Sequence, residues 1–185
     1  IKEVCLKNNL GYHLDGARLW NALVAKKETP KQYGELFDSI SICLSKGMGA
    51  PIGSLLLGNQ AFIKQARRIR KVFGGGMRQA GYMAAAGIYA LENNIARLSE
   101  DHEHARQIAE VLGRKEFIGN IMPVETNILI FEVKGNYSSA KEFCTILKQH
   151  DILCLPISQS QVRMVTHLDF TKEMLKHLVK VIESM

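Results

Sequence analysis

The pattern of hydrophobic and polar residues over the first 45 positions predicts short helices that alternate with short strands. Apolar residues at helical spacing favour helices, and compact runs of β-prone residues favour strands. The expected order is the end of a helix, a strand, a helix and a buried strand, over residues 1–9, 12–15, 16–27 and 38–45. The second helix should stop before Pro30, because the residue before a proline is pushed out of the helical region. Strand, helix and strand together predict a βαβ unit with two parallel strands.

Residues 53–113 follow a different order, with one strand and then mostly helix. The run "GSLLLG" comes after a loop that is too short for a parallel crossover, so we expect its strand to run antiparallel to the one before it. A helix from Asn59 ends before the glycines at 74–76. A longer helical stretch from Met77 is expected to be kinked near Asn93.

A second unit is predicted after this helical stretch, with the boundary near residue 95. Its expected elements are a strand, a helix, two strands and a final helix, over residues 126–133, 139–150, 152–158, 161–167 and 171–185. The chain as a whole is therefore expected to have an α/β fold.

Composition excludes several classes of protein. The chain has 185 residues, of which 46% are hydrophobic, so it can bury the core of one or two globular units. No apolar run approaches the roughly 20 residues of a membrane-spanning helix, so we expect no membrane association. Its four cysteines are scattered singly, which favours reduced thiols and a cytoplasmic location. The net charge of +6 leaves nucleic acid or an anionic small molecule open as a ligand.

Asp15 and Lys46 stand at the carboxyl ends of the two strands predicted to be parallel. These ends share one edge of the sheet, where α/β proteins bind ligands. Arg18 can point to the same edge. The N-terminus of a helix favours anions, so the helix dipole does not stabilise an arginine there, and a role in ligand binding would explain its position. A structural interpretation is also open, in which Asp15 caps the helix and Lys46 is solvated. The glycines around Lys46 favour the ligand, because they let the backbone approach a bound group.

The chemistry of such a pair points to one cofactor. Burial lowers the pKa of a lysine and leaves a free amine that forms a Schiff base with an aldehyde. An aspartate facing a pyridine nitrogen keeps that ring protonated and able to accept electrons. The pair of Asp15 and Lys46 therefore suits pyridoxal 5'-phosphate.

Four segments together resemble a known family. They read "YHLDGARLWNA", "DSISICLSKGMGAPIGSLLLG", "RRIRKVFGGGMRQAGYMAAAGIYAL" and "VRMVTHLD". In this order they are similar to the low-specificity L-threonine aldolases, in the β-eliminating lyase group of fold-type I pyridoxal phosphate enzymes. The resemblance implies that residues 1–95 are the C-terminal portion of the cofactor-binding large domain and that 96–185 form a small α+β domain. It also implies a fragment, since family members carry about as much chain again before this segment.

The resemblance assigns roles to five residues around the cofactor. Lys46 would hold pyridoxal phosphate as a Schiff base, Asp15 would pair with its pyridine nitrogen, and Arg18 would bind its phenolic oxygen. Lys71 and Arg78 would lie near the cofactor phosphate and the subunit interface. The glycines between them lead into a helix N-terminus, which independently suits phosphate.

The resemblance also implies a substrate and a reaction. Arg163 would bind the α-carboxylate of an amino-acid substrate, a task that suits the planar guanidinium. The implied reaction is aldol cleavage of L-threonine or L-allo-threonine to glycine and an aldehyde, catalysed by a lyase. The implied assembly is a homo-oligomer, tetramer or dimer, with its sites at subunit interfaces.

Two alternatives stay open at this point. The same scaffold could run β-elimination, racemisation or transamination, because a fold does not decide which bond breaks. The chain could instead be a non-catalytic fragment whose basic helix 60–71 binds nucleic acid or an acidic partner. No aromatic residues interleave with the arginines of that helix, so we expect no nucleic-acid binding. We also expect no metal, since His102 and His104 are two apart on a helix and face different ways.

Overall fold

The computed structural model describes the whole chain, residues 1–185, as a mixed α/β protein. The chain divides into two compact units, Ile1–Ala96 and Arg97–Met185, and each unit contains its own sheet. None of the helices combines the length and the apolar character that crossing a membrane requires.

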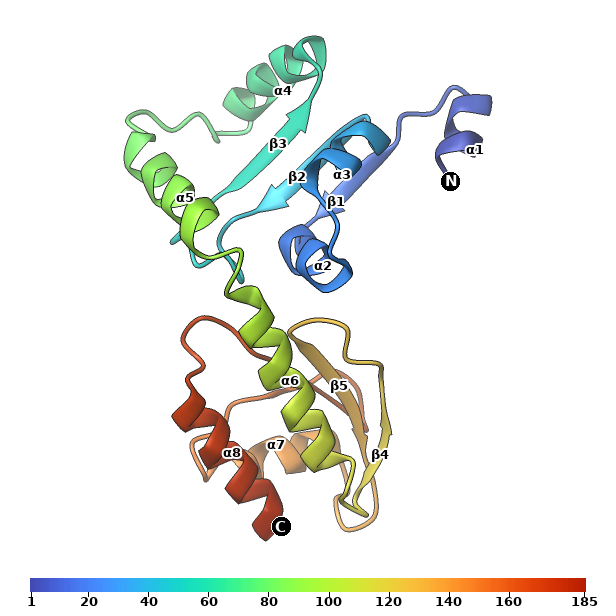
Figure 1. The fold of residues 1–185 in the computed structure, drawn as a ribbon, viewed down its shortest axis with the longest axis vertical. Coiled ribbons are helices and arrows are strands. Elements are labelled where there is room, and N and C mark those ends of the chain that lie inside the picture. The colour runs from blue at the N-terminus through green and yellow to red at the C-terminus, as the bar shows by residue number, and fades with distance from the viewer. The chain divides into compact units, whose positions relative to one another are not determined.

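Unit 1 contains a three-stranded sheet with the order β1-β2-β3. Its strands are β1 (His13–Gly16), β2 (Ser39–Cys43) and β3 (Ser54–Gly58). The first two strands pair in parallel and the last two pair antiparallel, so β1 and β2 point one way and β3 the other (Figure 1). Both strand directions predicted from the lengths of the connections are confirmed.

Five helices accompany this sheet. They are α1 (Lys2–Lys7), α2 (Leu19–Lys26), α3 (Pro30–Leu36), α4 (Gln60–Val72) and α5 (Gly81–Asn93). Helix α2 begins three residues later than predicted, because Gly16 still belongs to β1. Helix α3 was not predicted at all. Pro30 begins it, and Thr29 and Gln32 form a capping box in which the Thr29 N–H donates to Gln32 Oε1 over 2.6 Å.

The long helical stretch predicted from Met77 consists of two helices. Helix α5 starts at Gly81, four residues later than expected, and ends at Asn93, while α6 (Leu98–Leu112) belongs to unit 2. The break lies where the kink was predicted. There the Asn94 side chain donates to the Met48 carbonyl over 2.7 Å, which ties the end of α5 to the loop after β2.

The core of unit 1 is small, and much apolar surface lies outside it. Its buried apolar side chains include Leu19, Leu23, Ile40, Ile42, Leu44 and Ala90. Helix α4 buries no residue, and every residue of β3 is exposed. The exposed apolar side chains of this unit include Leu55, Leu56, Leu57, Phe62, Ile69, Tyr82 and Ile88. Unit 1 therefore presents apolar surface on β3, α4 and α5 that its own core does not use.

Unit 2 contains a four-stranded antiparallel sheet with the order β4-β5-β7-β6. Its strands are β4 (Ile118–Ile121), β5 (Ile128–Val133), β6 (Leu155–Pro156) and β7 (Gln161–Val165). Strand β4 was not predicted. Its sequence "IGNI" holds a glycine and an asparagine, which have low strand propensity, so its structure depends on pairing with β5.

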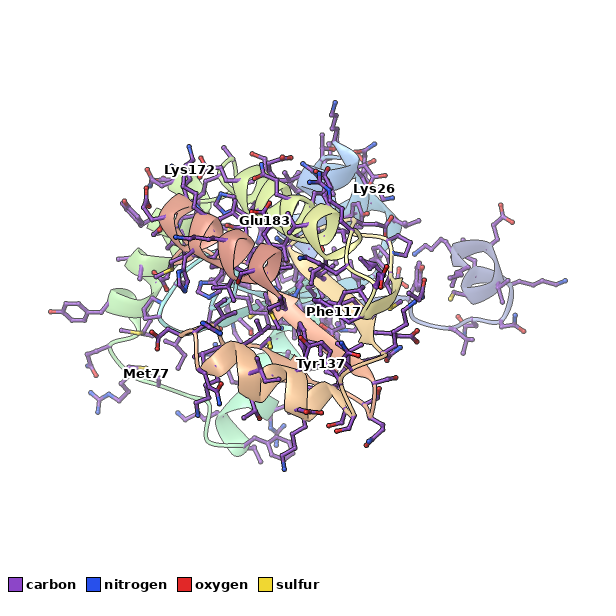
Figure 2. The ribbon with its side chains drawn as sticks, turned by 90° about the horizontal axis from the view of Figure 1, so that it is seen from below. Lys26, Met77, Phe117, Tyr137, Lys172 and Glu183 are labelled. Carbon is purple, nitrogen blue, oxygen red and sulfur yellow. The ribbon has the colours of Figure 1, made fainter.

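The helices of unit 2 pack on one face of this sheet. Helices α6, α7 (Ala140–Lys148) and α8 (Lys172–Ser184) share one apolar cluster with alternate residues of β5 and β7. Phe131 meets Phe143 edge-on with 5.8 Å between ring centroids, and Phe117 meets Tyr137 edge-on at 5.1 Å. Figure 2 shows Phe117 and Tyr137 near each other. The intervening residues of β5 and β7 are half-buried and lie on the other face, and Arg163 is among them.

Candidate active site

Asp15 closes the turn from β1 into α2. Its Oδ1 accepts a hydrogen bond from the Ala17 N–H over 3.1 Å, and its side chain is exposed. Asp15 therefore closes a local turn and does not cap α2, whose N-cap residue is Arg18, so the interpretation of Asp15 as a helix cap is wrong. The carboxylate stays open to solvent at the carboxyl end of β1, so turn formation does not prevent it from binding a cationic group.

Gly16 is required by the close approach of β1 and β2. A Cβ atom at this position would lie 2.5 Å from the Ser41 carbonyl oxygen, closer than Cβ atoms approach in real proteins. The glycine therefore lets the turn that carries Asp15 and Arg18 lie against β2. Sequence reasoning did not single out Gly16, although it stands between the two predicted site residues.

Arg18 occupies the N-cap position of α2 rather than its first turn. It is half-buried, and its backbone φ of −133° and ψ of 34° are not helical, so the helix begins directly after it. The residue follows Asp15 by three positions and stays at the carboxyl end of β1, as the sequence predicted.

Lys46 lies in a folded loop that follows β2. The loop is closed by hydrogen bonds from the Leu44 N–H to the Gly53 carbonyl over 2.9 Å and from the Gly49 N–H to the Lys46 carbonyl over 2.8 Å. Gly49 and Gly53 have φ angles of 72° and 129°, which favour glycine. Met48 is only 2% exposed and anchors the loop.

The Lys46 side chain itself is exposed and forms no hydrogen bond or ion pair. The sequence left open a solvated lysine or a buried amine held against a ligand, and the Lys46 side chain is solvated in this structure. The reason is local: Leu44, Met48 and Ala50 fill the core side of the loop, and Lys46 turns to the other side.

The charge of Lys46 acts on the neighbouring thiol of Cys43. Partial burial raises the pKa of Cys43, but hydrogen bonding with Ser45 and the positive charge of Lys46 outweigh it and hold the pKa below its usual value. The Cys43 Sγ lies 3.4 Å from the Ser45 Oγ.

Lys71 and Arg78 flank the three glycines that separate α4 from α5. Lys71 lies in the last turn of α4, Arg78 precedes α5, and both side chains are exposed. Gly74 has a φ of 81° and its N–H donates to the Lys71 carbonyl over 3.1 Å, so this glycine turns the chain after α4. Ala80 is the N-cap of α5 and provides no side-chain cap, so the first N–H groups of that helix stay available to an anion.

Arg163 lies on β7 in unit 2, on the face away from the helices. It pairs directly with Ile130 of β5 on one side and Leu155 of β6 on the other. The residue is half-buried, and its side chain forms no hydrogen bond or ion pair. A half-buried cation between two apolar neighbours, with no acidic partner, is suited to binding a carboxylate from outside the chain. Sequence reasoning did not identify Ile130 and Leu155, whose positions depend on strand register.

The predicted site residues thus fall into three groups. Asp15 and Arg18 follow the carboxyl end of β1 and Lys46 follows that of β2, and the parallel pairing of the two strands puts both ends at one edge of the sheet. Lys71 and Arg78 lie on the turn between α4 and α5 of the same unit, and Arg163 belongs to unit 2.

Comparison with solved structures identifies the fold class of the chain. The structure superposes on the threonine aldolase of Leishmania major with a TM-score of 0.77 at 19% identity, covering 99% of this chain and 54% of that one. The chain therefore contains part of the fold of the fold-type I pyridoxal phosphate enzymes. Residues 1–136 match the β-eliminating lyase family, and the chain belongs to that family.

Sequence relatives agree with this assignment. The chain is 47% identical over 176 residues to the low-specificity L-threonine aldolase of Escherichia coli K12, covering 94% of this chain and 50% of that protein. It is 37% identical over 173 residues to low-specificity L-threonine aldolase 1 of Arabidopsis thaliana, covering 92% and 48% respectively. The chain therefore spans about half the length of the curated relatives it matches.

The residues present fit the cofactor of this fold class. Pyridoxal phosphate needs an amine for its aldehyde, an acid for its pyridine nitrogen and cationic or N–H donors for its phosphate. Lys46 and Asp15 provide the first two at one sheet edge, and the exposed turn with Lys71 and Arg78 provides donors of the third kind.

Proposed function

We propose that the full-length protein containing this chain is a pyridoxal phosphate-dependent lyase. It cleaves L-threonine and L-allo-threonine to glycine and acetaldehyde, and related β-hydroxy-α-amino acids to glycine and the matching aldehyde. The observation that carries this proposal is the placement of Asp15 and Lys46 at the carboxyl ends of adjacent parallel strands. The identity of 47% to an L-threonine aldolase supports the choice of substrate.

The proposed roles of the cofactor-binding residues follow from their chemistry. Lys46 would hold the cofactor through its Nζ, and Asp15 would face the pyridine nitrogen with the carboxylate oxygen that does not bind the Ala17 N–H. Arg18 would donate to the phenolic oxygen, and Lys71 and Arg78 would neutralise the phosphate. When bound, pyridoxal phosphate supplies a protonated ring that takes up the electron pair released when the Cα–Cβ bond breaks.

Arg163 would position the substrate. Its guanidinium can donate two parallel hydrogen bonds to the α-carboxylate, which fixes both the location and the orientation of the amino acid. Because Ile130 and Leu155 flank it and provide no competing acceptor, the incoming carboxylate would be its charged partner. The Lys46 amine, at the carboxyl ends of β1 and β2 in unit 1, can carry a proton on Nζ once substrate is bound.

The exposed apolar surface of unit 1 supports a proposal about assembly. Residues of β3, α4 and α5 expose Leu55, Phe62, Ile69, Tyr82 and Ile88, and monomeric proteins rarely leave so much apolar surface open. We infer that the remainder of the full-length chain covers part of this surface and that a homo-oligomer, dimer or tetramer, with sites at subunit interfaces, covers the rest. A cytoplasmic location is proposed from the four scattered, unbridged cysteines.

A product assay on the full-length protein tests the proposed reaction. With pyridoxal phosphate and L-threonine, we expect glycine and acetaldehyde in equal amounts. Release of ammonia without glycine would identify β-elimination instead. Formation of D-allo-threonine would identify racemisation, and a hydroxy-keto acid formed without free ammonia would identify transamination. Any of these as the main reaction would contradict the proposal.

A further inference from the structure

Two of the four cysteines lie side by side in unit 2. Cys144 belongs to α7, Cys154 immediately precedes β6, and the Cys154 thiol donates to the Cys144 sulfur over 3.2 Å. The other two cysteines, Cys5 and Cys43, lie in unit 1. Unit 2 therefore contains one close pair of thiols, from segments ten residues apart.

The surroundings of the pair hold both thiols in place. Cys144 is 9% exposed within the core cluster, and Cys154 is half-buried and packs against the same cluster. A disulfide has an S–S distance of about 2.05 Å, so the two sulfurs need to approach by only about 1.2 Å more.

We propose that Cys144 and Cys154 form an intramolecular disulfide when the protein meets a low-molecular-weight disulfide such as oxidised glutathione. One protein thiolate attacks a sulfur of the oxidant, forms a mixed disulfide and releases one small thiol. The second cysteine then attacks the protein sulfur of that mixed disulfide and releases the second small thiol. The two protein thiols lose two protons and two electrons in total, and the oxidant takes them up as two thiols.

The segment around Cys154 gives the oxidant access. Leu153 and Leu155, its two neighbours, are 80% and 61% exposed, so the half-buried Cys154 can be reached from solvent. Burial raises the pKa of Cys154 and of Cys144, so both are thiols rather than thiolates at neutral pH. Little thiolate is therefore present at either sulfur, so exchange should be slower than at an ordinary exposed cysteine.

Cys154 is adjacent in sequence to Leu155, the residue that pairs with Arg163. Strand β6 has only two residues, and its Leu155 pairs directly with Arg163. A disulfide at Cys154 places a covalent restraint one residue from that pair. The connection to substrate binding rests on the proposed function, whereas the disulfide itself does not.

Peptide mapping of the full-length protein tests the proposal. The protein is incubated with excess oxidised glutathione until no further change occurs, quenched in acid, unfolded and alkylated. We expect the peptides of Cys144 and Cys154 to be joined and unalkylated, and we expect dithiothreitol to separate them. The readout is independent of catalysis, so it holds whichever reaction the enzyme performs.

Three cysteine variants sharpen this test. The double variant Cys5→Ser with Cys43→Ser should still form the bond, whereas Cys144→Ser and Cys154→Ser should each leave the remaining partner as a mixed disulfide or free thiol. Wild-type mapping decides the question even if a variant does not fold. Alkylation of both Cys144 and Cys154 after exhaustive oxidation, or their pairing with other cysteines, would overturn the proposal.

Discussion

Asp15 on β1 lies directly opposite Ser41 on β2 in a parallel register, and Lys46 follows five residues later in the loop after β2. This register brings a carboxylate and an amine from segments 31 residues apart to one edge of the sheet. The same contact with Ser41 requires the glycine at position 16. The site and the local packing therefore depend on the same pair of strands.

The charge of Asp15 can be tested separately from its role in the turn. Asp15→Asn keeps an oxygen that accepts from the Ala17 N–H, but it cannot stabilise a protonated pyridine nitrogen. We expect normal folding and a loss of threonine cleavage of about 100-fold or more, the scale on which a positioned catalytic group contributes. Steady-state kinetics and circular dichroism measure the two effects. Activity within about threefold of wild type would argue against the role.

Substrate binding by Arg163 is expected to depend on its planar shape as well as its charge. Arg163→Lys keeps the charge and loses the paired hydrogen bonds, so we expect kcat/KM for L-threonine to fall about 10- to 100-fold, mostly through KM. Gln161→Ala, on the same face of β7, is the matched control and should change KM little. Equal effects of the two substitutions would contradict the assignment.

Gly16 provides a test of the packing behind the site. Gly16→Ala places a Cβ against the Ser41 carbonyl and should reduce the free energy of unfolding by about 1–3 kcal/mol, as overpacking does. Gly11→Ala is the control, since a Cβ there meets nothing within 4 Å. Urea unfolding of the two variants compares them. A Gly16→Ala protein as stable as Gly11→Ala would show that β1 and β2 accommodate the added Cβ without a loss in the free energy of unfolding.

His102 is expected to make the protein less stable in acid. It is 3% exposed, and burial lowers its pKa below the usual value of 6.5. The folded state therefore prefers the neutral ring, while the unfolded state takes up a proton as the pH falls below 6.5. Its contribution to stability is complete above that pH and is lost on further acidification. Thermal midpoints measured across this range should fall less steeply for His102→Gln than for wild type, whereas the exposed His150→Gln should behave as wild type.

The sequence predicted the elements that follow simple patterns, and it failed where tertiary pairing decides. Strand directions in unit 1 followed from connection lengths, and Lys46 and Asp15 could be placed at one edge before the structure was known. Helix α3 was missed because Pro30 was interpreted only as a stop, although Thr29 and Gln32 carried the signal of a capping box. Strand β4 had no comparable signal, because its "IGNI" sequence becomes a strand only through β5.

The surroundings of the predicted site residues were harder to predict than their positions. The exposure of Lys46 depends on which residues of the loop fill the core, and Met48 and Ala50 do so. The apolar neighbours of Arg163 come from strand register, which one sequence does not specify. Glycines and charged residues could be identified locally, but their contacts depend on segments far along the chain.

Covalent trapping tests the role of Lys46 most directly. The full-length protein is incubated with pyridoxal phosphate, reduced with borohydride and digested, and the labelled peptide is identified by mass spectrometry. We expect the pyridoxyl group on Lys46, and we expect Lys46→Ala to lose both the label and threonine cleavage, while the exposed Lys31→Ala retains both. Label on a different lysine, or threonine cleavage that survives in Lys46→Ala, would contradict the assignment of Lys46 as the cofactor-binding residue.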